Sequence, residues 1–199
     1  MSRLATHRLG SIVFTSLLPV ALTVLPLSAQ EGNPNATPAM LRSEYLTNMK
    51  EVEEKVVSLA EAIPADKYTW RPAAGVRSIS EALMHIASEH YVYLPMNLGA
   101  KPPADLNMGT GREIFANLEK VTTKADVIRH LKASFAHQKT VLEGADALLN
   151  TGKVTAFGQE HTVANLFIIF IADQHEHLGQ LIAYARMNGV TPPWTKKGG

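Results

Sequence analysis

The stretch FIADQHEHLGQ, at positions 170–180, places ionisable side chains inside the most apolar run of the chain. Neither Pro nor Gly interrupts this run before Gly179, so it predicts one long helix. On that helix Asp173 and His177 are four residues apart, and they therefore lie on one face, one turn from each other. Apolar residues share that side, which is expected to face a core: Leu166, Phe170 and Tyr184.

A carboxylate and an imidazole on a buried face are unfavourable unless a partner compensates them. A divalent metal ion is one such partner. An Asp–His hydrogen bond, or a helix turned so that both groups reach solvent, is the simpler explanation of Asp173 and His177 unless a third ligand comes from elsewhere in the chain. His175 lies about 200° around the helix from both, and it can join them only if the helix is distorted.

A third ligand is expected from a second helix. Ser78 and Glu81 have the spacing of a capping box, which predicts a helix from 78 to about 94, where Pro95 ends or kinks it. His85 lies on one face of this helix, and Glu89 follows one turn later on the same face. Glu89 is expected either to orient the ring of His85 or to bind the metal directly.

Helical periodicity and capping residues predict four long helices. They cover residues 38–63, 78–94, 123–150 and 162–188, with a short helix from 112 to 119 in a connecting loop. Residues 151–160 are expected to be a short link, and no convincing strand pattern occurs. The fold class is therefore predicted to be all-α, as a four-helix bundle, and such bundles build metal sites from side chains that face inward.

The first residues are expected to be a secretory signal. Arg3, His7 and Arg8 precede an apolar run from about residue 12 to 27, and Leu-Ser-Ala at 27–29 suits cleavage after Ala29. The expected domains are a signal peptide (1–29), a flexible leader (30–36), the helical domain (37–194) and a tail (195–199). The mature protein is expected to be periplasmic or secreted, without a stable membrane anchor.

Composition excludes several classes of function. The 199 residues carry a formal net charge of +1, and removing Arg3 and Arg8 leaves 17 basic and 18 acidic residues, a charge of −1. No basic cluster occurs, so a nucleic-acid partner is not expected. The absence of Cys rules out disulfides and a cysteine nucleophile.

Three stretches resemble the DinB-like superfamily, whose members are four-helix proteins with metal-binding histidines. Trp70-Arg71-Pro72 leads to EALMHIA at 81–87, HLGQL occupies 177–181, and YARMNGV occupies 184–190 before Pro192-Pro193. The resemblance covers about residues 41–194. It implies a DinB-like bundle with a divalent metal held by His85 and by an HxxxH pair on the last helix.

The sequence departs from the family pattern at one ligand. The first His of HxxxH falls on Asp173, which binds the same metals through oxygen with harder character. The expected metal ligands are thus His85, Asp173 and His177, with His175 as the alternative to Asp173. If Asp173 does not bind, the protein is a relative of the fold that has lost its metal.

Two hypotheses for function remain open. In the first, Zn or Ni on these ligands activates a bound water or thiol for hydrolysis or thiol transfer on a small-molecule substrate. Glu89 and Tyr93 are then the candidates for proton transfer, and the resemblance implies low-molecular-weight thiols as co-substrates. In the second, the protein is a non-catalytic exported bundle that binds a small ligand or a protein. A homodimer is left open in both.

Overall fold

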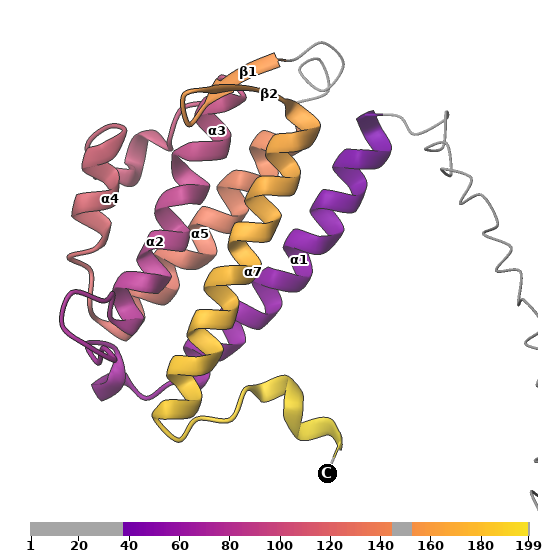
Figure 1. The fold of residues 1–199 in the computed structure, drawn as a ribbon. Coiled ribbons are helices and arrows are strands. Elements are labelled where there is room, and N and C mark those ends of the chain that lie inside the picture. The colour runs from indigo at the N-terminus through magenta and orange to yellow at the C-terminus, as the bar shows by residue number, and fades with distance from the viewer. Residues whose placement is uncertain (1–37, 145–152, 199) are drawn as a thin grey trace, which may run out of the picture. The chain divides into compact units, whose positions relative to one another are not determined.

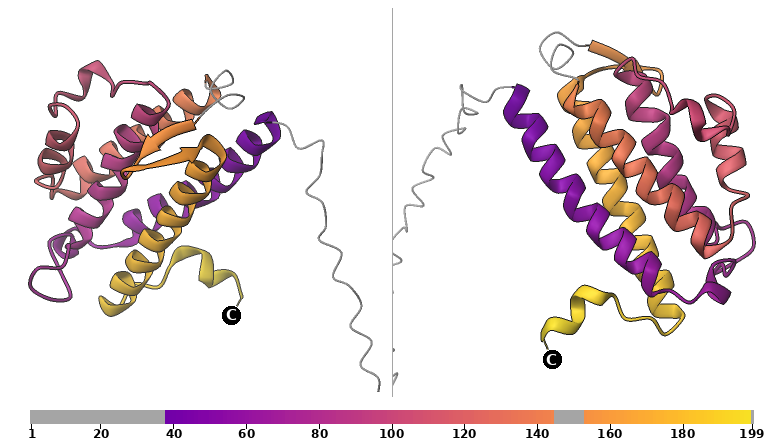
Figure 2. Two further views of the ribbon diagram at one scale, coloured as in Figure 1. Left: turned by 45° about the horizontal axis from the view of Figure 1, so that its top comes forward. Right: turned by 180° about the vertical axis from the view of Figure 1, so that it is seen from behind.

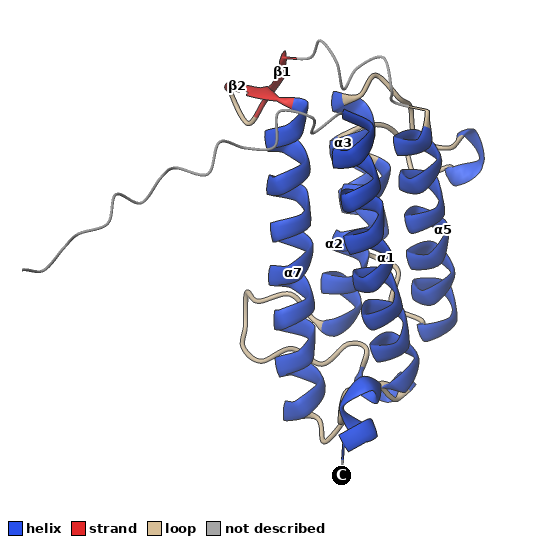
Figure 3. Cartoon of the chain, turned by 90° about the vertical axis from the view of Figure 1, so that its right-hand side faces the viewer, coloured by secondary structure: helices blue, strands red, loops and turns tan. Residues whose placement is uncertain are grey.

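The computed structural model describes residues 38–144 and 153–198. Its long helices are α1 (Pro38–Ala62), α2 (Ile79–Tyr91), α5 (Lys124–Glu143) and α7 (Val163–Met187). Helices α1 and α2 each contact both α5 and α7, so the four close into a bundle (Figures 1 and 3). A fifth helix, α4 (Arg112–Leu118), packs on the outside of α2. The predicted all-α bundle is therefore confirmed.

The direction of the helices decides which residues meet. Helices α1 and α7 run one way through the bundle, and α2 and α5 run the other way (Figure 1). Because α2 and α5 are parallel, the chain must return between them, and it does so through α4 (Figure 2). Helices α2 and α7 are antiparallel neighbours, so the middle of one lies beside the middle of the other.

The core is continuous across the bundle and contains the face predicted for α7. That helix buries, among others, Leu166, Phe167, Phe170, Leu178, Leu181 and Tyr184. The other three long helices contribute an apolar stripe each, which includes Val52, Val56, Leu59, Leu83, Ile86, Leu131 and Phe135. His175 lies on the opposite side of α7 and is exposed, as its helical position predicts.

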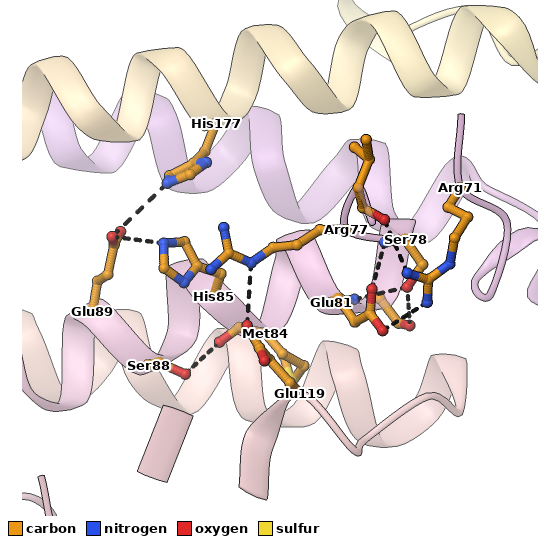
Figure 4. A network of polar contacts seen from close by, with 12 residues as sticks. Arg71, Arg77, Ser78, Glu81, Met84, His85, Ser88, Glu89, Glu119 and His177 are labelled. Carbon is orange, nitrogen blue, oxygen red and sulfur yellow. Dashed lines mark hydrogen bonds and ion pairs between the residues drawn. The ribbon is translucent and has the colours of Figure 1, made fainter. Parts of the chain in front are cut away.

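The predicted capping box fixes the start of α2. The backbone N–H of Glu81 donates to Oγ of Ser78 at 3.3 Å, and the backbone N–H of Ser78 donates to Glu81 at 2.6 Å. Arg71 also donates to Glu81, at 2.8 Å, and to the carbonyl of Val76 (Figure 4). These bonds tie the preceding loop to the first turn of α2.

The second predicted helix is broken near its end. Helix α2 stops at Tyr91, and a short helix, α3 (Tyr93–Asn97), follows after Val92. Pro95 lies inside α3 rather than at a boundary. It has no N–H for the carbonyl of Tyr91, and its ring pushes that carbonyl away, which accounts for a break one turn earlier.

The expectation of no strands is wrong. Strands β1 (Lys153–Ala156) and β2 (Gln159–Thr162) pair antiparallel, with Phe157 and Gly158 as the two-residue turn. Only Ala156 is buried in the hairpin, so its four-residue strands carry no alternating apolar pattern. The hairpin caps the end of the bundle, where β1 contacts α3 (Figure 2).

The remaining elements are short. Among residues 38–144 and 153–198, three 3-10 helices occur, at Ala65–Lys67, Ala104–Leu106 and Pro193–Gly198. The last of these includes most of the expected tail and contacts α1. The predicted signal peptide, the leader and the residues expected to end the third long helix, 145–150, lie outside the described residues. No helix in the described ranges is long and apolar enough to cross a membrane.

Candidate metal centre

Three side chains from α2 and α7 converge in the middle of the bundle. His85, Glu89 and His177 each offer one ligand atom, and these atoms all lie within 4.8 Å of one another. Nε2 of His85 is 3.1 Å from Oε1 of Glu89, and Nε2 of His177 is 3.8 Å from the same oxygen (Figure 4). The two rings are edge to face, with centroids 4.9 Å apart. The predicted meeting of His85 and His177 is thus observed.

Asp173 lies beside this group. Its Oδ2 is 3.5 Å from Nε2 of His177, and that oxygen is buried without a hydrogen-bond partner. The carboxylate within the three-atom group is that of Glu89, so ligation by Asp173 stays a prediction. His175 is exposed on the other side of α7 and is not among the converging residues.

The pKa values of the two carboxylates are shifted by burial, by each other and by the adjacent histidines. Burial would raise the pKa of Glu89, but its contacts with His177, His85 and Asp173 outweigh burial and hold that pKa well below its usual range. Burial and the adjacent charge of Glu89 raise the pKa of Asp173 to about 6. Burial would lower the pKa of His177, yet its contacts with Glu89 and Asp173 raise it. The pocket therefore favours positive charge.

A chain of contacts on α7 favours the tautomer of His177 that is protonated on Nδ1. Nε2 of Gln180 donates to the hydroxyl of Tyr184 at 2.8 Å, so Oε1 of Gln180 faces the ring. That oxygen lies 3.4 Å from Nδ1 of His177, so it can accept a hydrogen bond from a proton carried on Nδ1. In that neutral tautomer Nε2 of His177 presents its lone pair, as a metal ligand requires. Tyr184 in turn packs edge-on against Trp70, at 5.6 Å between centroids.

Glu89 is held by a second, buried network. Nε2 of Gln174 donates to Oε2 of Glu89 at 3.1 Å. Oε1 of Gln174 is 3.0 Å from Nε2 of His90, and Nδ1 of His90 is 3.2 Å from Oγ of Ser134 on α5. All four side chains are buried. Oε2 of Glu89 is thus engaged, while Oε1 faces the two histidines.

The sequence did not identify Gln174 and His90 as part of the site. Their positions carry a signal, because Gln174 precedes His177 by three residues and His90 directly follows Glu89. A buried amide one helical turn from a ligand is a typical support for that ligand. Tyr93, the other proton-transfer candidate, lies one turn beyond Glu89 and packs among aromatic rings.

The donor set fits a divalent transition metal. Two imidazoles and a carboxylate are a common catalytic zinc set, which leaves a coordination position for water or substrate. Oδ2 of Asp173, which is buried without a hydrogen bond, and the adjacent Glu89 leave negative charge that a cation would compensate. The group of His85, Glu89 and His177 could therefore hold a metal ion.

The sequence matches a known protein family. The family model of the DinB superfamily matches residues 48–181. This range begins within α1 and ends within α7. No curated protein matches the sequence. The matched residues include His85, Glu89, Asp173 and His177 and make up more than half of the chain. The chain therefore belongs to the DinB superfamily.

Proposed function

We propose that this DinB superfamily protein holds a divalent metal ion on His85, Glu89 and His177, with Asp173 as a further ligand or hydrogen-bond partner. The observation that supports this most is the convergence of the three ligand atoms within 4.8 Å. The tautomer of His177 adds to it, because Gln180 occupies Nδ1 and leaves Nε2 toward Glu89.

Zn and Ni are the metals that the donor set favours. Imidazole nitrogens suit both ions, whereas Mg and Ca prefer sites built from oxygen alone. With one or two carboxylates, the site is harder than a site of three histidines. We therefore expect measurable binding of either ion.

A divalent ion lowers the pKa of a bound water or thiol, so that a nucleophile exists near neutral pH. Around it, Gln174 keeps Glu89 oriented and Gln180 keeps His177 in the ligating tautomer. Asp173 is close enough to His177 to exchange a proton with a group in the site. The reaction we propose is metal-assisted hydrolysis or thiol transfer on a small molecule.

The first experiment is titration of the metal-free protein, expressed without a His-tag, with Zn and Ni, accompanied by elemental analysis of the protein as purified. One ion per chain is expected, and His85→Ala and His177→Ala should lose it. His161→Ala is the matched control, because His161 also lies beside α7 and contacts Asn165 instead. Stoichiometric binding that survives both ligand substitutions would reject the site, and so would a protein that binds neither ion.

Export to the periplasm or the medium is also proposed, from residues 1–29. The mature chain should then begin near Gln30 when the full gene is expressed in a secreting host. N-terminal sequencing that finds Met1 or Ser2 would reject this part.

A further inference from the structure

A cluster of aromatic rings lies at the end of the bundle. Tyr93 of α3 contacts Phe115 of α4 at 4.9 Å between ring centroids, Phe157 of the hairpin turn at 5.9 Å, and Phe170 of α7 at 6.4 Å. Phe157 and Phe170 are also 6.4 Å apart. Four elements thus contribute one ring each.

This cluster is adjacent to the metal centre. Phe170 precedes Asp173 by three residues on α7, so its ring is about one helical turn from that carboxylate. Tyr93 follows Glu89 by four residues, just after the break at Val92. Phe115 contacts the ring of His85, with centroids 5.8 Å apart. A molecule seated against Phe115 would therefore lie one side chain away from His85.

These rings are not packed into a closed core. Tyr93, Phe115 and Phe157 line a cavity of about 450 Å³ together with Val92, Met96, Asn97, Gly111 and Arg112. Phe157 is 62% exposed, Met96 52% and Tyr93 37%. A cavity of this volume suits a molecule of one or two rings.

Phe157 occupies a position that the fold alone does not explain. It has φ of 54° and Gly158 has φ of 76°, as in the two-residue hairpin turns that favour Asn-Gly. A bulky residue is uncommon in this left-handed region. The chain thus keeps a strained and exposed phenyl ring over the cavity, where Asn would make a better turn.

One residue that lines the cavity is positively charged. Arg112, at the start of α4, is exposed, and its side chain makes no hydrogen bond or ion pair within the described parts of the chain. Most other arginines near the bundle are paired, as Arg71 is with Glu81 and Arg77 with Glu119. An unpaired guanidinium beside aromatic rings favours an anionic aromatic ligand.

We propose that this cavity binds a small aromatic carboxylate, with its ring against Tyr93, Phe115 and Phe157 and its carboxylate on Arg112. As a substrate site it rests on the proposed metal-dependent function, because the ligand would lie next to His85. Binding of the aromatic anion itself does not depend on the metal.

The test is calorimetric titration of the metal-free protein, in EDTA, with 2-naphthoate, 2-naphthylmethanol and cyclohexanecarboxylate. We expect 2-naphthoate to bind most tightly. Phe157→Asn should weaken its binding about three- to tenfold, by loss of one aromatic contact, without lowering the melting temperature. Arg112→Gln should remove the preference for 2-naphthoate over the neutral alcohol.

Ile168→Gln is the matched control, because Ile168 is 61% exposed and does not line the cavity. It should leave all three affinities unchanged. The proposal is overturned if the wild-type protein does not bind 2-naphthoate, or if Phe157→Asn binds it as tightly. A dimer that Phe157→Asn dissolves would assign the rings to a subunit interface and would also overturn it.

The metal centre and the aromatic site can be tested independently of each other. His85→Ala should lose Zn and retain 2-naphthoate in EDTA. A protein that binds 2-naphthoate but no metal would reject the proposed function and keep the aromatic site. A protein that binds Zn but no aromatic ligand would do the reverse.

Discussion

Gln174 on α7 donates a hydrogen bond to Oε2 of Glu89 on α2, at 3.1 Å, and both side chains are buried. This bond crosses the interface between the two helices that carry the metal centre. Because Oε2 is occupied, Oε1 is the oxygen that faces His85 and His177. Gln174 is itself oriented by His90, so the direction of the Glu89 carboxylate is set by residues outside the ligand group.

Replacing Gln174 should therefore weaken metal binding without removing a ligand. We expect Gln174→Met, which nearly preserves volume, to lower Zn affinity about 10- to 100-fold. It should also lower the free energy of unfolding by about 1–3 kcal/mol, because Nε2 of His90 loses its buried partner. Calorimetric titration and urea unfolding measure the two effects.

The control for this variant is Gln138→Met. Gln138 is equally buried, but it donates to the hydroxyl of Tyr45 on α1 and is not hydrogen-bonded to Glu89 or to either histidine of the metal centre. It should lose stability and keep Zn affinity. Equal Zn affinity in both variants would mean that Gln174 supports the fold alone.

Gln180 should control the tautomer of His177. In Gln180→Leu, Nδ1 of His177 has no acceptor, so the ring should exchange between tautomers and bind Zn about tenfold more weakly. Gln180→Glu supplies a carboxylate acceptor and should restore the Nδ1–H form. Nitrogen-15 NMR of the imidazole distinguishes the two tautomers, and a spectrum that Gln180→Leu leaves unchanged would refute this role.

Asp173 is the residue at which the family pattern and this sequence differ. If it is a ligand, Asp173→Ala should lose most metal binding, whereas Asp173→His should retain binding and shift preference toward softer, nitrogen-favouring metals. His175→Ala should bind as the wild type does, because its side chain lies on the other side of α7. Loss of metal in His175→Ala together with retention in Asp173→Ala would show that the assignment is wrong.

His90 should make the metal-free protein sensitive to acid. Burial lowers the pKa of His90 to about 4, from 6.5 in the unfolded chain. The unfolded chain therefore takes up a proton as the pH falls through 6.5, before the folded state does. Neutral His90 therefore contributes to the free energy of unfolding above pH 6.5. This contribution declines toward pH 4, by on the order of 2–3 kcal/mol.

His90→Gln removes this titration. In urea unfolding in EDTA, the free energy of unfolding of the wild type should exceed that of His90→Gln at pH 7, and this difference should shrink as the pH falls to 4. His175→Gln is the exposed control and should follow the wild type. An advantage of the wild type that stays constant over this range would contradict the assignment.

The helical faces were predictable from the sequence, and the contacts between them only in part. Periodicity predicted His85 on one helix and His177 on another, each on a face expected to be buried. This was enough to predict that the two side chains meet. Glu89 followed from its spacing to His85. Whether Glu89 or Asp173 faces both histidines depends on the rotation of α2 against α7, which periodicity does not determine to within one side chain.

Local exceptions were harder to predict. The hairpin has strands of four residues and a Phe in a turn position that favours Asn, so neither its strands nor its turn has the usual pattern. The break at Val92 is caused by a proline three residues later, and such breaks are placed imprecisely from sequence. The network from Ser134 to Glu89 joins three helices and becomes visible only once they are packed.

The most direct test of the central claim is the position of a bound ion in crystals grown with Zn. Anomalous diffraction at the zinc edge should show one strong peak between α2 and α7, about 2.0–2.2 Å from Nε2 of His85, Nε2 of His177 and a carboxylate oxygen of Glu89. The peak should be absent from crystals of His177→Ala. A zinc peak that does not touch His85 and His177, or no peak in protein saturated with Zn, would contradict the account.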